Sequence, residues 1–398
     1  MKPELNAVVD SIPEALSIRI NQIVYDKKAR GERVYTYSLG EAFFQIPRFD
    51  ISDADWYSGY HYSSSMGVPA LRKKLAQMYE LYGVKVNPET EILISAGSKA
   101  LIFMVLQTIL SPGDNVLVPE PAWLSYKEQI KLAGGMHIPV PYTDAVYDWE
   151  KYITPKTKAI IINNPTNPSG KLFSQKEFDY LIKLAQKHNI FIISDEAYSD
   201  FLCKTEDFIS FAKFDKTKEH TIIVNSLSKN MGMSGWRVGY VICHADILKQ
   251  ILKLNQHIIT CAPTVLQNYM ADHFDEILSH TRPQAVQIAQ KRQRVSEIMK
   301  NIGIRPLPGV GTFYFLIDVS DFPGTTDELV YDLLINHNIA TVSGEAYGTS
   351  TSQFIRFGIG VEDLDAIEKS LHTIKSFLNL QTYDCTSIRE KMQKLEIK

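Results

Sequence analysis

The sequence predicts an α/β protein in which a mainly parallel sheet lies between two layers of helices. Three observations carry this prediction. Between about residues 90 and 245, short apolar runs alternate with amphipathic stretches, as in a sheet covered on both faces. The runs are almost continuously apolar, which is typical of strands buried on both sides. Proline and glycine then mark the entry into a second unit, in the stretch RPLPGVGTFYFLIDVS.

Six apolar runs are the expected strands of this sheet. Their lengths suit strands rather than helices. In chain order they are EILIS (91–95), NVLVP (115–119), KAIIINN (158–164), IFIISD (190–195), TIIVNS (221–226) and GYVIC (239–243).

Helical spacing separates these strands. Between 174 and 188, Phe178, Leu181 and Ile182 share one helical face, and Ser174 is suited to cap the N-terminus. The most apolar segment, ALIFMVLQTIL, is shorter than the roughly 18 residues that a membrane span needs. We therefore expect it to be a buried core helix, and we expect no membrane partner.

The remaining sequence predicts a small α+β unit at the C-terminus. FYFLIDV and FIRFGIG are its expected strands, and VEDLDAIEKSLHTIKSFL is an expected helix. We expect three parts. Residues 1–45 form an N-terminal segment that joins the small domain or a partner subunit. Residues 46–290 form the large domain, and residues 291–398 form the small domain. The last twelve residues predict an exposed helix or a frayed tail.

The composition predicts a globular protein that acts on small molecules. Of 398 residues, 45% are hydrophobic, and 42 Lys+Arg nearly balance 45 Asp+Glu, so the totals indicate no basic surface for nucleic acid. The four cysteines form no CxxC pair, which argues against a disulfide framework or a zinc site. No secretory signal is visible, because Asp10, Pro13 and Glu14 interrupt the first apolar residues. We therefore expect a cytoplasmic protein without a metal.

Polar motifs follow four of the expected strands. They are AGSK (96–99), NNPTNPSG (163–170), DEAY (195–198) and SLSK (226–229). Ligands of open parallel sheets bind at the carboxyl ends of the strands, so the motifs predict one shared crevice. NNPTNPSG alone is also explained as a turn, and DEAY and AGSK alone are also explained as helix starts. The joint placement of the motifs favours a binding site.

The stretch SLSKNMGMSGWRVGY predicts both an anion site and a reactive amine. A lysine directly after a buried strand is costly unless it is paired or used, and an amine with a pKa near ~10.4 becomes nucleophilic when it is desolvated. Lys229 is that lysine, with Ser226 and Arg237 as anion ligands beside it. A phosphate-bearing aldehyde would use both features. Asp195 would then hold a proton on a pyridine nitrogen, and Tyr198 would donate to a ring oxygen.

The sequence resembles the class I/II aminotransferases, aspartate-aminotransferase-like enzymes of fold type I that depend on pyridoxal 5'-phosphate. The resemblance is carried by PEPAWLSY, NNPTNPSG, SDEAY, SLSKNMGMSGWRVGY and FIRFGIG, in the family's order over nearly the whole chain. It implies a large domain with a mainly parallel seven-stranded sheet, a small domain built from both chain ends, and an active site shared across a homodimer.

The resemblance implies how the cofactor is held and used. Lys229 would form the Schiff base and move the proton between the substrate Cα and the cofactor C4'. The cofactor phosphate would be bound by Ser226, Arg237 and the N–H groups of Ser98 and Lys99.

The resemblance also implies partners for the cofactor ring. Asp195 matches the residue that pairs with the pyridinium nitrogen, and Asn167 and Tyr198 match the pair that hydrogen-bonds the ring O3'. Trp123 matches the aromatic side chain that stacks on the ring, with an ordinary core tryptophan as the alternative.

Four residues resemble substrate or partner ligands. Arg356 matches the arginine that binds the substrate α-carboxylate, with an exposed strand arginine as the alternative. Gly40 matches the glycine whose backbone touches the same carboxylate, and Asn167 lies among the substrate ligands as well. Tyr62 matches a tyrosine offered to the cofactor phosphate of the other subunit.

Departures from the family pattern concern the substrate. GEAFF stands where many relatives read Gly-Glu-Pro-Asp-Phe, and FGIG replaces the usual serine-rich end after Arg356. Ser98 stands where aspartate-aminotransferase-like members carry a lysine for the distal carboxylate, so residue matching does not support a dicarboxylate preference. Four aromatic residues leave a neutral or aromatic substrate equally open, with core packing as their alternative explanation: Phe43, Phe44, Tyr314 and Phe315.

We therefore expect an aminotransferase that moves the amino group of an L-amino acid to a 2-oxo acid by a ping-pong mechanism. A lyase or oxidase that uses the same cofactor and retains the α-carboxylate is the alternative. A cofactor-sensing regulator is disfavoured, because such regulators carry a DNA-binding domain ahead of the fold and the motifs here begin near Gly40. A dinucleotide-binding enzyme is disfavoured because no GxGxxG follows the early strands.

Overall fold

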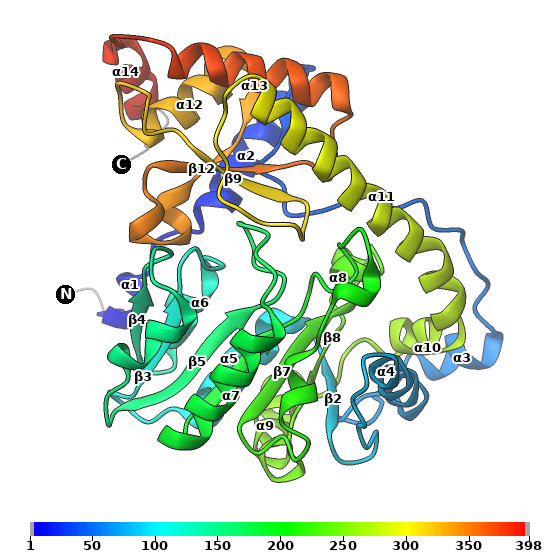
Figure 1. The fold of residues 1–398 in the computed structure, drawn as a ribbon. Coiled ribbons are helices and arrows are strands. Elements are labelled where there is room, and N and C mark those ends of the chain that lie inside the picture. The colour runs from blue at the N-terminus through cyan, green and yellow to red at the C-terminus, as the bar shows by residue number, and fades with distance from the viewer. Residues whose placement is uncertain (1–3, 395–398) are drawn as a thin grey trace.

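The computed structural model describes residues 4–394, and within them seven strands form one large sheet (Figure 1). The strand order is β2-β8-β7-β6-β5-β3-β4, and β8 alone among these strands runs antiparallel to its neighbours. The strands are β2 (Ile92–Ser95), β3 (Asn115–Pro119), β4 (Met136–Val140), β5 (Thr157–Asn163), β6 (Phe191–Asp195), β7 (Thr221–Ser226) and β8 (Gly239–Ile242). Each of the six predicted runs is a strand, and the predicted α/β fold with its mainly parallel sheet is confirmed.

Helices cover both faces of the sheet, because successive side chains of a strand point to opposite faces. In β5, Ile160 and Ile162 point into one apolar core and Ile161 points into the other. The first core packs against α4 (Pro69–Leu81), α7 (Gln175–His188) and α10 (Thr264–Asp272). The second packs against α5 (Ser98–Ile109), α6 (Ser125–Leu132) and α9 (Ala245–Ile258).

Two predicted helices are confirmed with their local causes. α7 begins directly after Ser174, whose hydroxyl accepts from the Glu177 N–H at 3.3 Å, while the Glu177 carboxylate accepts from the Ser174 N–H at 2.8 Å. α5 is largely buried, as expected of a core helix. Within residues 4–394, no helix combines the length and the apolar character that a membrane crossing requires.

One strand of the large sheet, β4, has no counterpart among the six predicted runs. Its residues, MHIPV, are mostly half-buried or exposed, because β4 lies at the edge of the sheet beside β3. Pro139 has no N–H to donate, which a strand tolerates at an edge. An edge strand of this kind lacks the continuous apolar run by which its neighbours are recognised.

A second unit lies above the carboxyl edge of the large sheet (Figure 1). Its three-stranded antiparallel sheet has the order β11-β12-β9, and β1 pairs in parallel with β10. The elements are α2 (Leu16–Ala29), β1 (Tyr35–Thr36), β9 (Tyr314–Asp318), α12 (Thr326–His337), β10 (Ile339–Ala340), β11 (Val342–Ser343), β12 (Phe354–Gly358), α13 (Leu364–Leu378) and α14 (Thr386–Lys394). Two short helices of the N-terminal region lie against the large unit, where α1 (Ala7–Asp10) contacts α6 and α3 (Asp53–Ser58) contacts α10.

The N-terminal segment contributes to the core of this second unit. Ile20 and Val24 of α2 belong to the same apolar cluster as Ile355 and Phe357 of β12. The predicted C-terminal helix is present as α14, where Ile388 is buried and Arg389 Nε lies 2.5 Å from Glu328 Oε1. The end of the predicted tail, 395–398, lies outside the described residues.

The long helix α11 (Phe274–Asn301) connects the two units (Figure 1). Phe274 and Ile277 belong to a core of the large sheet, whereas Val295 and Met299 belong to the core of the second unit. The expected division at residue 290 falls inside this helix. The domain limits 1–45, 46–290 and 291–398 stay a prediction.

Candidate active site

The carboxyl ends of β5, β6 and β7 open into a cleft of about 610 Å³ that both units line. The large unit contributes the strand ends, and the second unit contributes residues that include Ser38, Tyr314 and Arg356. The predicted site residues that line this cleft are Gly40, Ser98, Lys99, Trp123, Asn167, Asp195, Tyr198, Ser226, Lys229, Arg237 and Arg356. The fold therefore brings together motifs that lie more than 300 residues apart.

Lys229 projects into the cleft from α8 (Leu227–Asn230), directly after β7. Its Nζ donates a hydrogen bond to the Gly40 carbonyl oxygen at 2.5 Å. Burial lowers the pKa of Lys229 to about 8, and the carboxylate of Glu41 opposes this change. A lysine with this pKa has about a tenth of its amine unprotonated at pH 7, whereas an ordinary lysine has less than about a thousandth.

Asp195 ends β6 as a buried carboxylate that is held from two sides. Tyr126 OH donates to Oδ2 at 2.6 Å, and the Ala197 N–H donates to Oδ1 at 3.1 Å. Burial raises the pKa of Asp195, and these two hydrogen bonds counteract the rise. The carboxylate is thus fixed in orientation before any ligand binds.

Sequence reasoning missed Tyr126 as a partner of Asp195. The sequence feature that could have revealed this partner is the spacing in PAWLSY, where Tyr126 follows Trp123 by three residues. In the structure the Tyr126 N–H donates to the Trp123 carbonyl oxygen at 3.0 Å. The two rings meet edge to face, 5.3 Å apart. One turn of the chain therefore carries both the predicted stacking residue, Trp123, and Tyr126, which hydrogen-bonds the Asp195 carboxylate.

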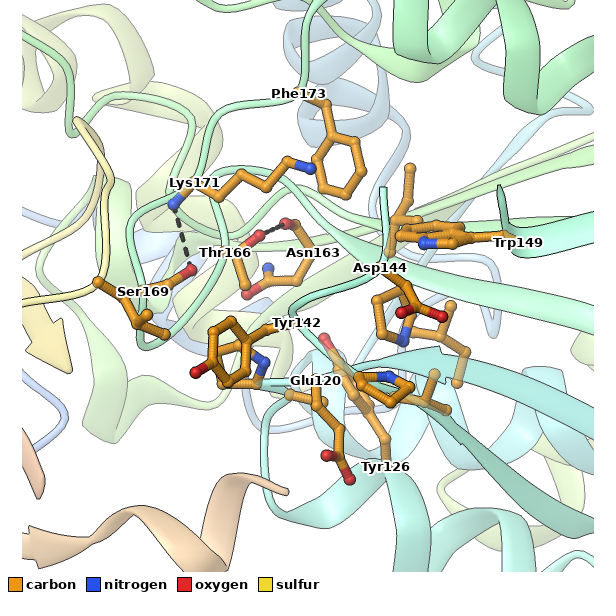
Figure 2. Close-up of a pocket in the computed structure, with 18 of the residues that line it drawn as sticks. Glu120, Tyr126, Tyr142, Asp144, Trp149, Asn163, Thr166, Ser169, Lys171 and Phe173 are labelled. Atoms are coloured by element: carbon orange, nitrogen blue, oxygen red, sulfur yellow. Dashed lines mark hydrogen bonds between the residues drawn. The ribbon is translucent and has the colours of Figure 1, made fainter. Parts of the chain in front are cut away.

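A second, smaller cavity of about 140 Å³ adjoins this region (Figure 2). Tyr126 lines it, and Asn163 lines both cavities while its Nδ2 donates to the Asp195 carbonyl oxygen at 2.9 Å. Tyr142 and Trp149 form part of its aromatic wall. None of the predicted site residues lines it, so the predicted chemistry belongs to the larger cleft.

A chain of polar side chains crosses the floor of the larger cleft. Asn167 Nδ2 donates to Tyr198 OH at 3.0 Å, and the hydroxyls of Tyr198 and Tyr314 lie 3.4 Å apart. The Asn167 Oδ1 atom is buried without a partner. Buried amide oxygens are nearly always paired, so this side chain has hydrogen-bonding capacity left for a ligand.

Among the four aromatic residues considered for the substrate, Tyr314 alone lines the cleft. Phe315 points to the other side of β9, where the Arg292 guanidinium lies 4.3 Å from its ring. Phe44 stacks on Phe201 with 6.0 Å between ring centres, and Phe43 is 63% exposed. Core packing therefore accounts for Phe44 and Phe315.

The start of α5 and the Arg237 guanidinium lie side by side. Gly97 precedes the helix at φ +88°, and a Cβ at this position would lie 2.6 Å from Arg237 Nη2. A Cβ on Gly239 would lie 2.3 Å from the Ser98 nitrogen. The free N–H groups of a helix start beside a guanidinium are well suited to bind a phosphate.

Trp123 lies partly exposed at the wall of the cleft rather than in the core. The Lys99 ammonium lies 5.1 Å from the centre of its ring. Burial lowers the pKa of Lys99, and the positive charge of Arg237 adds to this effect. Trp123 therefore lines the cleft, as a stacking role requires.

Arg356 is a buried arginine on β12 whose guanidinium faces the cleft between two tyrosine rings. Nη2 donates to the Ser38 carbonyl oxygen at 2.6 Å, and the rings of Tyr314 and Tyr347 lie 4.7 and 5.1 Å from the guanidinium carbon. Within residues 4–394, no carboxylate pairs with Arg356, and its Nε has no partner. A buried cation without an anion is costly, so this site favours a carboxylate ligand.

Tyr62 is the one predicted site residue that lies outside the cleft. Its side chain is 86% exposed. The predicted contact involves the other subunit, so a single chain does not test it.

Comparison with known proteins identifies the family. The family model for aminotransferase class I and II matches residues 58–371. The chain belongs to this family. The resemblance predicted from the motifs is therefore confirmed, and the protein is an aminotransferase.

Relatives of this aminotransferase match it over nearly its whole length. The aspartate aminotransferase of Bacillus sp. strain YM-2 is 31% identical over 95% of this chain and 100% of its own length. The probable aspartate/prephenate aminotransferase of Aquifex aeolicus is 31% identical over 94% of this chain and 100% of its own. A solved Methanococcus jannaschii structure, described as similar in its active site to kynurenine aminotransferases, is 28% identical with a TM-score of 0.82 and covers 94% of this chain and 100% of its own.

Proposed function

We propose that this aminotransferase moves the amino group of an L-amino acid to a 2-oxo acid by a ping-pong reaction at Lys229. The observation that carries the proposal is a half-buried amine with a pKa of about 8 in one cleft with the acid Asp195 and the unpaired Arg356. A lysine of this kind has about a tenth of its amine unprotonated at pH 7, far more than an ordinary lysine, and the free amine attacks a carbonyl carbon.

The cleft fits pyridoxal 5'-phosphate, the cofactor on which this family depends. When bound, the cofactor supplies an aldehyde for the Schiff base with Lys229 and a ring that accepts electrons from the substrate. The phosphate ligands would be Arg237, Ser226 and the N–H groups of Ser98 and Lys99. The adjacent positions of the α5 start and the Arg237 guanidinium support this assignment.

The remaining cleft residues fit the ring of the cofactor. Asp195 would hold a proton on the ring nitrogen, a role supported by its anchoring by Tyr126. Asn167 and Tyr198 would hydrogen-bond the ring O3', which the hydrogen bond between their side chains in the cleft supports, because it places the Asn167 amide and the Tyr198 hydroxyl side by side. Trp123 would stack on the ring.

Arg356 would bind the α-carboxylate of the amino acid, with the Gly40 backbone and Asn167 beside it. The absence of a carboxylate partner for this buried arginine within residues 4–394 supports the role. Ser98 does not offer a cation to a distal carboxylate, and Tyr314 presents an aromatic ring at the same cleft. The cleft is therefore compatible with a neutral or aromatic side chain.

A half-reaction without an acceptor tests the proposed reaction. The purified chain loaded with pyridoxal 5'-phosphate is mixed with each of the standard amino acids alone. We expect one equivalent of 2-oxo acid per active site, after which the reaction stops until a 2-oxo acid is added. Continued turnover without an acceptor would instead identify a lyase or an oxidase with the same cofactor.

We also propose a homodimer in which Tyr62 completes the partner's site. Large aromatic side chains on and after α3 are exposed, which is typical of an interaction surface: Trp56, Tyr57, Tyr60 and Tyr62. In an equal mixture of Tyr62→Ala and Lys229→Ala chains, subunit exchange would restore one intact site in each mixed dimer. We expect about a quarter of the wild-type activity after exchange. A monomer in sedimentation, or no recovery on mixing, would contradict the shared site.

A cytoplasmic location stays a prediction, with which the four free cysteines are compatible.

A further inference from the structure

Glu41 and Lys99 are charged residues of the cleft whose side chains take no part in the proposed contacts with cofactor and substrate. Glu41 lies in the stretch GEAFF, one residue after Gly40, and its side chain is half-buried. No ion pair joins it to a cation within residues 4–394. An unpaired carboxylate beside a reactive lysine therefore requires an explanation.

The stretch 40–44 contacts the lysine loop at three points. The Gly40 carbonyl accepts from Lys229 Nζ at 2.5 Å. The Glu41 carboxylate accepts a hydrogen bond from the Ser234 hydroxyl, on the loop after Lys229. Phe44 packs against Gly232, where a Cβ would lie 2.8 Å from Phe44 Cδ2. These contacts hold the loop at the lysine and at two points after it, and we call residues 40–44 the lysine clamp.

The second unit supports the lysine clamp from behind. A Cβ at Gly360 would lie 2.2 Å from the Glu41 carbonyl oxygen and 3.1 Å from the Ala42 Cα. The backbone of the clamp is therefore packed directly on the turn after β12. This close approach leaves the Glu41 backbone little room to move, and the hydrogen bond from Ser234 fixes its carboxylate.

Four charged groups act on the Lys229 amine. Arg356 and Arg237 favour the neutral amine, as burial does, whereas Glu41 and Asp195 favour the ammonium. Asp195 is committed to the ring nitrogen in the proposed function. Glu41 is then the carboxylate whose charge remains available to the lysine throughout the reaction.

We propose that Glu41 is a positioning residue for Lys229: its carboxylate, fixed by Ser234, places a negative charge near the amine that donates to the Gly40 carbonyl and governs when that amine gives up its proton. The importance of this control rests on the proposed role of Lys229 as the reacting amine. The contacts themselves exist in the chain without its cofactor.

The proton affinity of Lys229 is measured directly in the full-length chain without cofactor. Competitive labelling with acetic anhydride, read by mass spectrometry of the Lys229 peptide from about pH 6 to about pH 10, reports the free amine. The wild-type midpoint is expected near pH 8. Glu41→Gln removes a negative charge, which destabilises the ammonium, so its midpoint should fall by roughly one pH unit. Labelling of Lys229 near pH 7 should then rise several-fold.

Two further variants make the test specific. Ser234→Ala keeps the Glu41 charge but releases its anchor, so its midpoint should fall in the same direction by less. Glu297→Gln removes an exposed carboxylate on α11 and should leave the midpoint unchanged. An unchanged midpoint in Glu41→Gln would overturn the proposal. If that variant does not fold, an unchanged midpoint in Ser234→Ala overturns it instead.

The same series distinguishes failure of this inference from failure of the proposed function. Labelling requires no cofactor, so a shifted midpoint supports the lysine clamp even if pyridoxal 5'-phosphate gives no absorbance band with the wild-type chain. Conversely, the wild-type chain could show a normal cofactor band and a normal half-reaction while no variant shifts the labelling midpoint of Lys229. That result would retain the proposed function and reject the role of Glu41.

Discussion

Replacing Lys229 by alanine is expected to lower kcat for transamination by at least ~10³-fold, because the substituted side chain can neither attack the cofactor aldehyde nor carry the Cα proton. The methyl group also cannot donate to the Gly40 carbonyl, which Lys229 Nζ does at 2.5 Å. The visible absorbance that arises from covalent attachment of the cofactor should be absent. Steady-state kinetics and the absorption spectrum of the loaded chain measure the two effects.

Lys291→Ala is the matched control for this prediction. Lys291 is also a partly buried lysine whose Nζ donates to a backbone carbonyl, that of Ile359 at 2.8 Å, and burial lowers its pKa as well. It does not line the cleft. The control should keep both the absorbance and kcat. A Lys229→Ala chain that retained the absorbance band and turned over normally would refute the assignment of the reacting amine.

The sequence was sufficient to predict the central strands because each is buried on both faces. In β5, consecutive isoleucines serve two cores at once, so the run is apolar throughout and is recognised without knowledge of its neighbours. β4 was missed for the opposite reason. At the sheet edge, MHIPV is partly exposed and contains a proline, so its pairing with β3 depends on tertiary position rather than on a local pattern.

The site residues on strand ends were also predictable, because parallel strands bring their carboxyl ends to one edge. Lys229 and Asn167 follow such ends, Asp195 is the last residue of another strand, and all three line one cleft. Contacts between side chains from separate elements were not predictable. The hydrogen bond from Tyr126 to Asp195 joins α6 to β6, and the contact of Glu41 with Ser234 joins segments almost 200 residues apart.

Position in the fold also resolved the aromatic residues that the sequence left open. Tyr314 and Phe315 are neighbours on β9, so they necessarily point to opposite faces, but the sequence does not say which face meets the cleft. The structure assigns Tyr314 to the cleft and Phe315 to Arg292. Tyr62 illustrates the converse limit, since a residue that serves another subunit has no contact within its own chain to reveal its role.

Asp195→Asn is expected to lower kcat by about 10²- to 10⁴-fold while changing the KM of the amino acid far less. The amide has the shape of the carboxylate and can still accept from Tyr126, but it lacks the negative charge that would keep a proton on the ring nitrogen. Arg356, which would bind the substrate α-carboxylate, is unaffected, so ground-state binding should persist. Separate kcat and KM values, measured at saturating cofactor, distinguish this result from weak cofactor binding.

Asp200→Asn shows whether that effect comes from the site or from burial alone. Asp200 is another buried aspartate, burial raises its pKa like that of Asp195, and its Oδ2 lies 3.7 Å from Arg282 Nε. It does not line the cleft, so its amide variant should lower the melting temperature by weakening a buried pair while kcat per folded chain stays near the wild-type value. Equal losses of kcat in both variants would mean that the loss reflects damage to the buried interior, and the role of Asp195 at the ring nitrogen would have to be abandoned.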